Sequence, residues 1–242
     1  MLAPKIKFCG MTRVEDAELA VELGAWAVGM VFHRDSPRNC PQELAAEIGA
    51  TLKRRTEVVG VFHNATLTTI DRIARDCGLT LVQLHGDEGP VYCDEVARRT
   101  GCGVVKAARV RSVADVLDLR VYRTAFHLLD AHVEGQPGGT GVAFPWEYAA
   151  RHEGPAPVIL AGGLNPGNVA QAIDEAQPFA VDVASGVELS PGIKNPSLMR
   201  DFADEVNATK SSAKALRLRD QARRDAASGS VWRASEHPEQ AA

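Results

Sequence analysis

The fold is decided by the stretch at residues 5–32, KIKFCGMTRVEDAELAVELGAWAVGMVF. Its first apolar run, Ile6 to Cys9, precedes a segment of helical spacing, Val14 to Leu23, and a second apolar run, Ala27 to Phe32. The runs are apolar on both faces, which favours a parallel sheet covered by helices, because a half-exposed sheet would alternate polar and apolar residues. The stretch therefore predicts a strand, a helix and a second parallel strand.

The same alternation continues along the chain. Six further strands are predicted: Val58 to Phe62, Leu81 to Leu84, Val104 to Ala107, His127 to Asp130, Val158 to Ala161 and Ala180 to Val183. The other predicted helices are Gln42 to Leu52, Leu67 to Arg75, Val91 to Arg98, Val113 to Leu117, Trp146 to Arg151, Asn168 to Glu175 and Ser197 to Val206. Eight strand–helix units predict an α/β fold, a parallel eight-stranded (β/α)8 TIM barrel in one domain over residues 1–207. The alternative is an open doubly wound sheet, but its GxGxxG motif is missing after Cys9.

Helix boundaries have their own signals. Thr12 followed by Glu15 is expected to cap the first helix, and Pro41 to begin the second. Three glycines are expected to end helices: Gly24, Gly78 and Gly101.

Composition narrows the class of partner. The chain has 242 residues, which suits one barrel of roughly 250, and a net charge of -4 with no basic cluster in its first two hundred residues. A nucleic-acid partner is therefore not expected, and a small soluble molecule is. The most apolar run, residues 25–32, is too short to span a bilayer, and no signal-peptide core follows Met1, so we expect a cytoplasmic protein without a membrane partner. Five cysteines without a CxxC pair are expected to be reduced thiols.

Residues 208–242 differ in character. Basic residues are mixed there with alanine and serine, and no apolar stripe is sustained. We expect a partly helical or disordered basic tail, or alternatively an interaction segment centred on Trp232.

Barrel enzymes place their sites at the carboxyl ends of the strands, which makes Cys9 and Asp130 catalytic candidates. A thiolate at Cys9 can abstract a proton, and the first helix begins nearby to lower the thiol pKa, although a lone cysteine is equally consistent with a buried structural thiol. Asp130 follows an apolar run and is expected to face the mouth of the barrel as an acid or base.

Three glycine-bearing loops predict a phosphate site. The loop after the sixth strand contains Gly139, Thr140 and Gly141; Gly162 and Gly163 follow the seventh strand, and Ser185 and Gly186 the eighth. Backbone N–H groups of loops after the last strands commonly bind phosphate in such barrels, although each glycine alone is equally consistent with a tight turn.

Other side chains are weaker candidates. Arg38 can bind a carboxylate through its planar guanidinium, or be a solvated loop residue. Gln83 and His85 end the fourth strand and are expected to contact the substrate, and Lys106 is a candidate in the fifth. His63 and His132 are expected at the surface. No pair of residues has metal-ligand spacing, so no metal is predicted.

Six motifs together resemble the phosphoribosylanthranilate isomerase family. They are KFCGMT at 7–12, QLHG at 83–86, LLD at 128–130, GGTG at 138–141, AGGLN at 161–165 and VDVASGVE at 181–188, and the resemblance runs from about Lys5 to Phe202. Two positions depart from the family pattern, which usually has isoleucine where Phe8 stands and serine where Ala184 stands.

The resemblance implies a step of tryptophan biosynthesis. This step is the cofactor-free Amadori rearrangement of N-(5-phosphoribosyl)anthranilate to 1-(o-carboxyphenylamino)-1-deoxyribulose 5-phosphate. In the family's mechanism the residue matching Cys9 is the general base and that matching Asp130 the general acid. The residue matching Arg38 would hold the anthranilate carboxylate, the glycine loops the phosphate, and Asp182 would support the electrostatics of substrate binding.

Two alternatives stay open. The related histidine-pathway isomerase acts on a similar phosphoribosyl compound, but an aspartate is expected there in place of Cys9. A non-catalytic barrel that binds a sugar phosphate or a protein is the other alternative, against which the presence of Cys9, Asp130 and Arg38 argues. The chain is expected to be a monomer or a homodimer.

Overall fold

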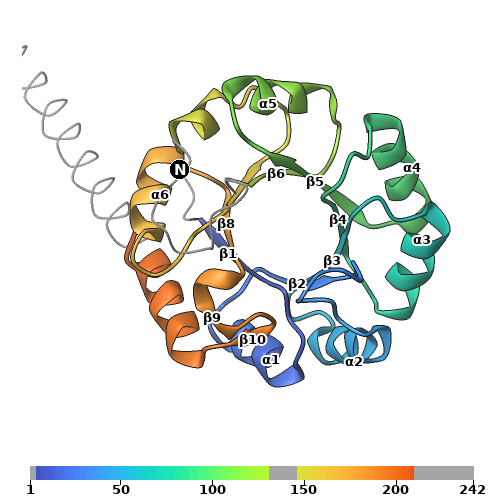
Figure 1. Ribbon diagram of the computed structural model, residues 1–242, viewed down its shortest axis with the longest axis horizontal. Helices are drawn as coiled ribbons and strands as arrows, with labels where there is room; N and C mark the ends of the chain where they lie inside the picture. Colours follow the sequence, from blue (N-terminus) through green and yellow to red (C-terminus); the bar gives the residue numbers. More distant parts are fainter. Residues whose placement is uncertain (1–3, 131–145, 210–242) are drawn as a thin grey trace, which may run out of the picture.

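The computed structural model describes residues 4–130 and 146–209. Eight parallel strands form a closed barrel in chain order, with β8 paired back to β1 (Figure 1). The strands are β1 (Lys5–Cys9), β2 (Ala27–Val31), β3 (Glu57–Phe62), β4 (Leu81–Leu84), β5 (Gly103–Arg109), β6 (Phe126–Asp130), β7 (Val158–Ala161) and β8 (Ala180–Val183). All eight predicted strands are confirmed, and with them the TIM barrel.

Helices surround the barrel (Figure 1). They are α1 (Val14–Glu22), α2 (Gln42–Leu52), α3 (Leu67–Asp76), α4 (Pro90–Thr100), α5 (Val113–Leu117) and α6 (Val169–Ala176), and a further helix occupies residues 196–209. Short 3-10 helices are η1 (Asp118–Val121), η2 (Trp146–Arg151) and η3 (Ser185–Val187). The segment predicted as the sixth helix is therefore a 3-10 helix, η2. Gly24, Gly78 and Gly101 each have a positive φ, as expected of residues that end helices.

Strand alternation divides the apolar residues into two layers. One layer fills the barrel: Ala27, Val59, Leu81, Val105, Ala107, Leu128, Ile159, Ala161 and Ala180. Trp26, Phe126 and Phe179 pack edge-on or tilted against one another beside the amino ends of their strands. The larger layer lies between the strands and the helices. Phe8 belongs to that outer layer, because its ring packs edge-on against the ring of Phe202 in the last helix, with 6.0 Å between the ring centroids. The phenylalanine at position 8, where the family usually has isoleucine, therefore changes the packing between the strands and the helices and not the interior of the barrel.

A small hairpin that follows β8 contacts the segment between β1 and α1 and the first turn of α1. It consists of β9 (Glu188–Ser190) and β10 (Ile193–Lys194), which lie beside α1 (Figure 1). Thr12 donates to the backbone carbonyl of Gly192, and the backbone N–H of Lys194 donates to Asp16. The prediction that Thr12 caps α1 is wrong, since the N-cap residue is Arg13 and the Thr12 hydroxyl binds the hairpin instead. None of the helices in residues 4–130 and 146–209 is long and apolar enough to cross a membrane.

Candidate active site

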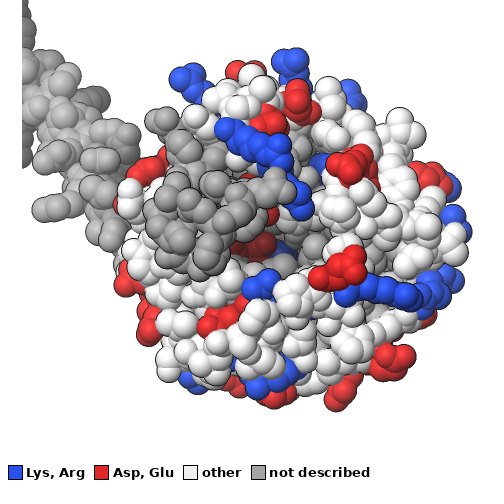
Figure 2. All heavy atoms as spheres, viewed as in Figure 1, with Lys and Arg blue, Asp and Glu red and all other residues white. Residues whose placement is uncertain are grey.

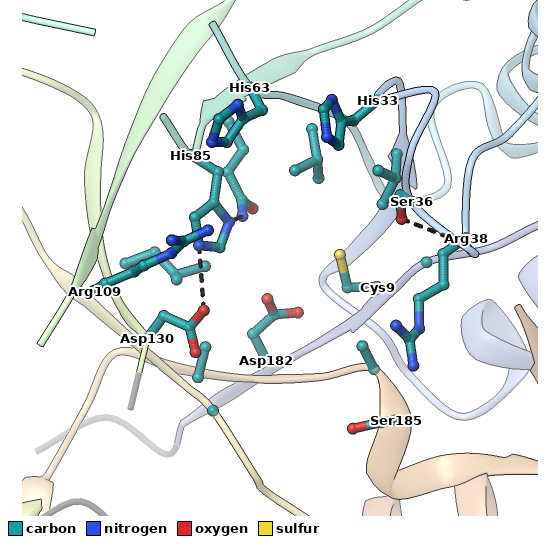
Figure 3. A pocket seen from close by; sticks show the side chains of 18 of the residues that line it. Cys9, His33, Ser36, Arg38, His63, His85, Arg109, Asp130, Asp182 and Ser185 are labelled. Atoms are coloured by element: carbon teal, nitrogen blue, oxygen red, sulfur yellow. Dashed lines mark hydrogen bonds and ion pairs between the residues drawn. The ribbon is translucent and has the colours of Figure 1, made fainter. Parts of the chain in front are cut away.

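A cavity of about 420 Å³ lies at the carboxyl ends of the strands. It is seen as a hollow at the centre of the face in Figure 2, with charged side chains of both signs around it. Its lining includes both predicted proton carriers, Cys9 and Asp130, together with residues from the ends of the other six strands and the loops that follow them. In Figure 3 Asp130 and Arg38 lie on opposite sides of this cavity, with Cys9 and Asp182 between them.

Cys9 is the last residue of β1 and is buried. Its cross-strand neighbour is Gly29, and a Cβ at Gly29 would lie only 2.9 Å from the Cys9 sulfur. The absence of a side chain there leaves room for the thiol. Burial raises the pKa of Cys9, while the cations of Lys7 and Lys194 act in the opposite direction. Burial has the larger effect and the pKa of the thiol stays raised, but positive charges that favour the thiolate lie close by.

Asp182 forms an ion pair with Lys7. The ammonium of Lys7 lies 2.9 Å from each carboxylate oxygen of Asp182, and both side chains are buried. The two residues are direct neighbours in the register of β1 and β8, so closure of the barrel brings them together. Burial alone would lower the pKa of Lys7, but Asp182 and Cys9 outweigh it and the pKa is raised.

Asp130 is adjacent to a short polar chain from β4. Its Oδ2 lies 3.2 Å from Nε2 of His85, and Nδ1 of His85 lies 3.3 Å from the Gln83 amide nitrogen. The amide oxygen of Gln83 is buried and has no hydrogen-bond partner among the described residues. Gln83 also lines the cavity, so an acceptor without a partner among the described residues lies beside it.

Arg38 reaches the cavity from the loop after β2 and is bound by Glu188 of β9. Its Nε lies 2.9 Å from Oε1 and its Nη2 lies 2.7 Å from Oε2 of Glu188. Lys194 also donates to Glu188, at 2.9 Å, and to the backbone carbonyl of Cys9, at 2.6 Å. Burial would raise the pKa of Glu188, but Arg38 and Lys194 outweigh it and hold the pKa low. The Nη1 group of Arg38 has no hydrogen-bond partner in the described part of the chain.

Gly10 makes room for this arginine. Its φ of +79° is a left-handed conformation, and a Cβ at Gly10 would lie 2.7 Å from Cδ of Arg38. The glycine that follows Cys9 therefore lets the chain turn and lets Arg38 lie across it.

Two of the three predicted phosphate loops, those after β7 and β8, lie against each other at the cavity. Gly162, Gly163 and Ser185 line the cavity, and Gly186 packs so closely that a Cβ would lie 1.9 Å from the carbonyl oxygen of Leu164. The third loop, with Gly139, Thr140 and Gly141, lies outside the described residues, as do His132, Trp232 and the chain from residue 210.

Some side chains differ from expectation. Lys106 points to the outer side of β5, where it contacts the carbonyl of Gly86 and the carboxylate of Glu88, so it does not line the cavity. His63, expected at the surface, does line it, next to His33 with ring centroids 5.1 Å apart. Arg109 lines it too. His33 and His63 each follow a strand closely, and Arg109 ends one. The search for residues at the carboxyl ends of strands, which found Cys9, would therefore have found these three as well.

The fold and this cavity define the class of TIM-barrel enzymes, with a thiol, a carboxyl and a guanidinium among the groups that line the cavity. In the described residues, no three His, Cys, Asp or Glu side chains gather as a metal site requires.

Comparison with known proteins identifies the family. A family model described as N-(5'-phosphoribosyl)anthranilate (PRA) isomerase matches residues 6–205. The N-(5'-phosphoribosyl)anthranilate isomerase of Citrifermentans bemidjiense is 50% identical over 202 residues, covering 84% of this chain and 96% of that protein. The chain belongs to the N-(5'-phosphoribosyl)anthranilate isomerase family and is an isomerase of the aldose–ketose type.

Solved structures agree with this assignment. The phosphoribosyl anthranilate isomerase of Thermotoga maritima matches with a TM-score of 0.76 at 38% identity, over 85% of this chain and 99% of that one. A phosphoribosyl anthranilate isomerase in complex with reduced 1-(o-carboxyphenylamino)-1-deoxyribulose 5-phosphate matches with a TM-score of 0.73 at 37% identity, over the same shares.

Proposed function

We propose that this chain catalyses the Amadori rearrangement of N-(5-phosphoribosyl)anthranilate to 1-(o-carboxyphenylamino)-1-deoxyribulose 5-phosphate in tryptophan biosynthesis. The observation that carries the proposal is the presence of Cys9 and Asp130 on the lining of one cavity at the carboxyl ends of the strands. No cofactor is required, since the reaction moves protons and leaves the oxidation state of the whole substrate unchanged.

Asp130 is the proposed general acid. It gives a proton to the ring oxygen of the ribose as the bond from C1 to that oxygen breaks, and the nitrogen lone pair forms a C1–N double bond. The carboxyl lies 3.2 Å from His85, whose imidazole can orient it.

Cys9 is the proposed general base. Its thiolate takes the proton from C2, and the electrons of that C–H bond form a C1–C2 double bond as the C1–N double bond becomes single. The resulting enol loses its hydroxyl proton and gains one at C1, which gives the ketose. Asp130 has lost one proton and Cys9 has gained one, so the summed charge of the two side chains is unchanged.

The other groups of the cavity would bind the substrate. The Nη1 group of Arg38 can donate to the anthranilate carboxylate while Glu188 holds the rest of the guanidinium. The loops at Gly162–Gly163 and Ser185–Gly186 would bind the phosphate, as would Gly139, Thr140 and Gly141. The amide oxygen of Gln83, which has no partner among the described residues, would accept a hydrogen bond from a substrate hydroxyl or amine. We assign these groups to the barrel domain predicted over residues 1–207, whose last helix continues to residue 209.

The experiment is a direct assay of the purified chain on two substrates. Turnover of N-(5-phosphoribosyl)anthranilate is expected, and turnover of the histidine-pathway phosphoribosyl compound is not. Turnover of the second substrate alone would overturn the proposal. Turnover of neither, by protein that is folded by circular dichroism, would favour a non-catalytic barrel.

A further inference from the structure

A charged pair lies in the interior of the barrel, in the same layer as the apolar side chains that fill it. Lys7 is fully buried and does not line the cavity, whereas its partner Asp182 does. Burying two charges is costly, and it is repaid only by close pairing, which the two 2.9 Å contacts provide. The pair therefore needs an explanation beyond filling space.

The pair lies directly beside the thiol of Cys9. Lys7 and Cys9 are two residues apart on β1, so their side chains point to the same face. A Cβ at Gly29 would lie 3.3 Å from Nζ of Lys7 and 2.9 Å from Sγ of Cys9. The ammonium and the sulfur therefore both border the space that the missing side chain of Gly29 leaves. The other charged groups near the thiol are Lys194 and Arg38.

We propose that Lys7 is a positioning residue for the proposed reaction, whose ammonium stabilises the thiolate form of Cys9 and is itself held in place by Asp182. This inference rests on the proposed function, because it concerns how the proposed base is kept active. Lys7 stays protonated throughout, and the proton from substrate C2 resides on the sulfur of Cys9. No proton passes between Lys7 and Asp182.

The two partners of this ion pair have opposite effects on the thiol. Burial raises the pKa of Cys9 most, the Lys7 cation lowers it, and the Asp182 anion raises it. Lys7→Met should therefore shift the titration of the thiol upward, and Asp182→Asn should shift it downward. A residue that only holds the barrel together would not give opposite signs, since losing either partner would disturb the same contact.

The test is the rate of alkylation of Cys9 by iodoacetamide as a function of pH, measured on the full chain by peptide mass spectrometry to separate it from the other four cysteines. The expected midpoint rises by about one pH unit or more in Lys7→Met and falls in Asp182→Asn. Lys7→Arg, which keeps the cation, should return the midpoint toward that of the wild type. Lys106→Met is the matched control, because it also breaks a buried lysine ion pair, to Glu88, but away from Cys9.

Shifts of the same sign in both variants, or a Lys7→Met profile like that of Lys106→Met, would overturn the proposal. If a single variant does not fold, the double variant Lys7→Met/Asp182→Asn leaves no unpaired buried charge. It should show a smaller rise than Lys7→Met would, and an unchanged midpoint would overturn the proposal. Alkylation needs no substrate, so this result is independent of whether the chain turns over N-(5-phosphoribosyl)anthranilate.

Discussion

Arg38 donates three hydrogen bonds to Glu188, from Nε to Oε1 at 2.9 Å and to Oε2 at 3.1 Å and from Nη2 to Oε2 at 2.7 Å, although the residues are 150 positions apart. The contact joins the loop after β2 to the hairpin that follows β8, across the β1 end of the barrel. A planar guanidinium bound on one side by a carboxylate has a fixed orientation, so its remaining N–H groups are aimed before a ligand arrives.

Glu188→Gln should therefore weaken substrate binding more than it slows turnover. Loss of the charged partner leaves Arg38 free to rotate, and hydrogen bonds to charged groups contribute about 1.5–3 kcal/mol. We expect KM for N-(5-phosphoribosyl)anthranilate to rise about tenfold or more with a smaller change in kcat, measured by steady-state kinetics. Glu43→Gln, in the first turn of α2, is the control. An unchanged KM would show that Glu188 does not orient Arg38 for binding.

Gly186→Ala should disturb the two adjoining glycine loops. The added Cβ would lie 1.9 Å from the Leu164 carbonyl, so the loops must separate, at a cost of about 1–3 kcal/mol in the free energy of unfolding. We expect a lower Tm and weaker inhibition by inorganic phosphate. Gly89→Ala is the matched control, because its added Cβ has no atom of the described residues within 4 Å beyond its own chain neighbours. Equal phosphate inhibition in both variants would argue against a phosphate site at Gly186.

Gln83→Met should separate stability from activity. The variant removes a buried amide oxygen that has no partner among the described residues, and it fills a similar volume. We expect an equal or higher Tm together with a lower kcat/KM, because the acceptor offered to the substrate is lost. Thermal unfolding and steady-state kinetics on the same preparation test this. A kcat/KM equal to the wild type would exclude substrate binding by Gln83.

The stability of the fold should decline in mild acid because of His127. This histidine is buried in β6, with Nδ1 2.7 Å from Nε2 of His152, and burial and His152 lower its pKa to about 4. The unfolded chain takes up the proton near pH 6.5, so the stabilisation is complete above that pH and is lost as the pH falls toward 4. The loss by pH 4 is about 3 kcal/mol.

His127→Gln should flatten this dependence. Urea unfolding at pH 8 and at pH 5 measures the difference, with the value at pH 8 as the internal reference for the cost of the substitution itself. An identical decline in the variant and the wild type would mean that His127 does not cause it.

The sequence predicts the barrel well because each strand is apolar on both faces and each is followed by a helix. The sequence does not predict which charged side chains form ion pairs, because these pairs depend on how the barrel closes. Lys7 and Asp182 are 175 residues apart and become neighbours only when β8 pairs with β1. The binding of Arg38 by Glu188 depends on the hairpin that follows β8, for which the sequence carries no comparable signal. Lys106 was a candidate on strand position alone, whereas the alternation along β5 places it on the outer face.

The central claim is that Cys9 and Asp130 carry the protons of the isomerisation. It is tested most directly by kcat/KM for N-(5-phosphoribosyl)anthranilate in Cys9→Ala and Asp130→Ala, with Cys93→Ala as a control for loss of a buried cysteine outside the cavity. Removing a general acid or base should lower kcat/KM by about a hundredfold or more in each of the two variants, and the control should retain the wild-type value. A near-wild-type value in either Cys9→Ala or Asp130→Ala would contradict the assigned mechanism.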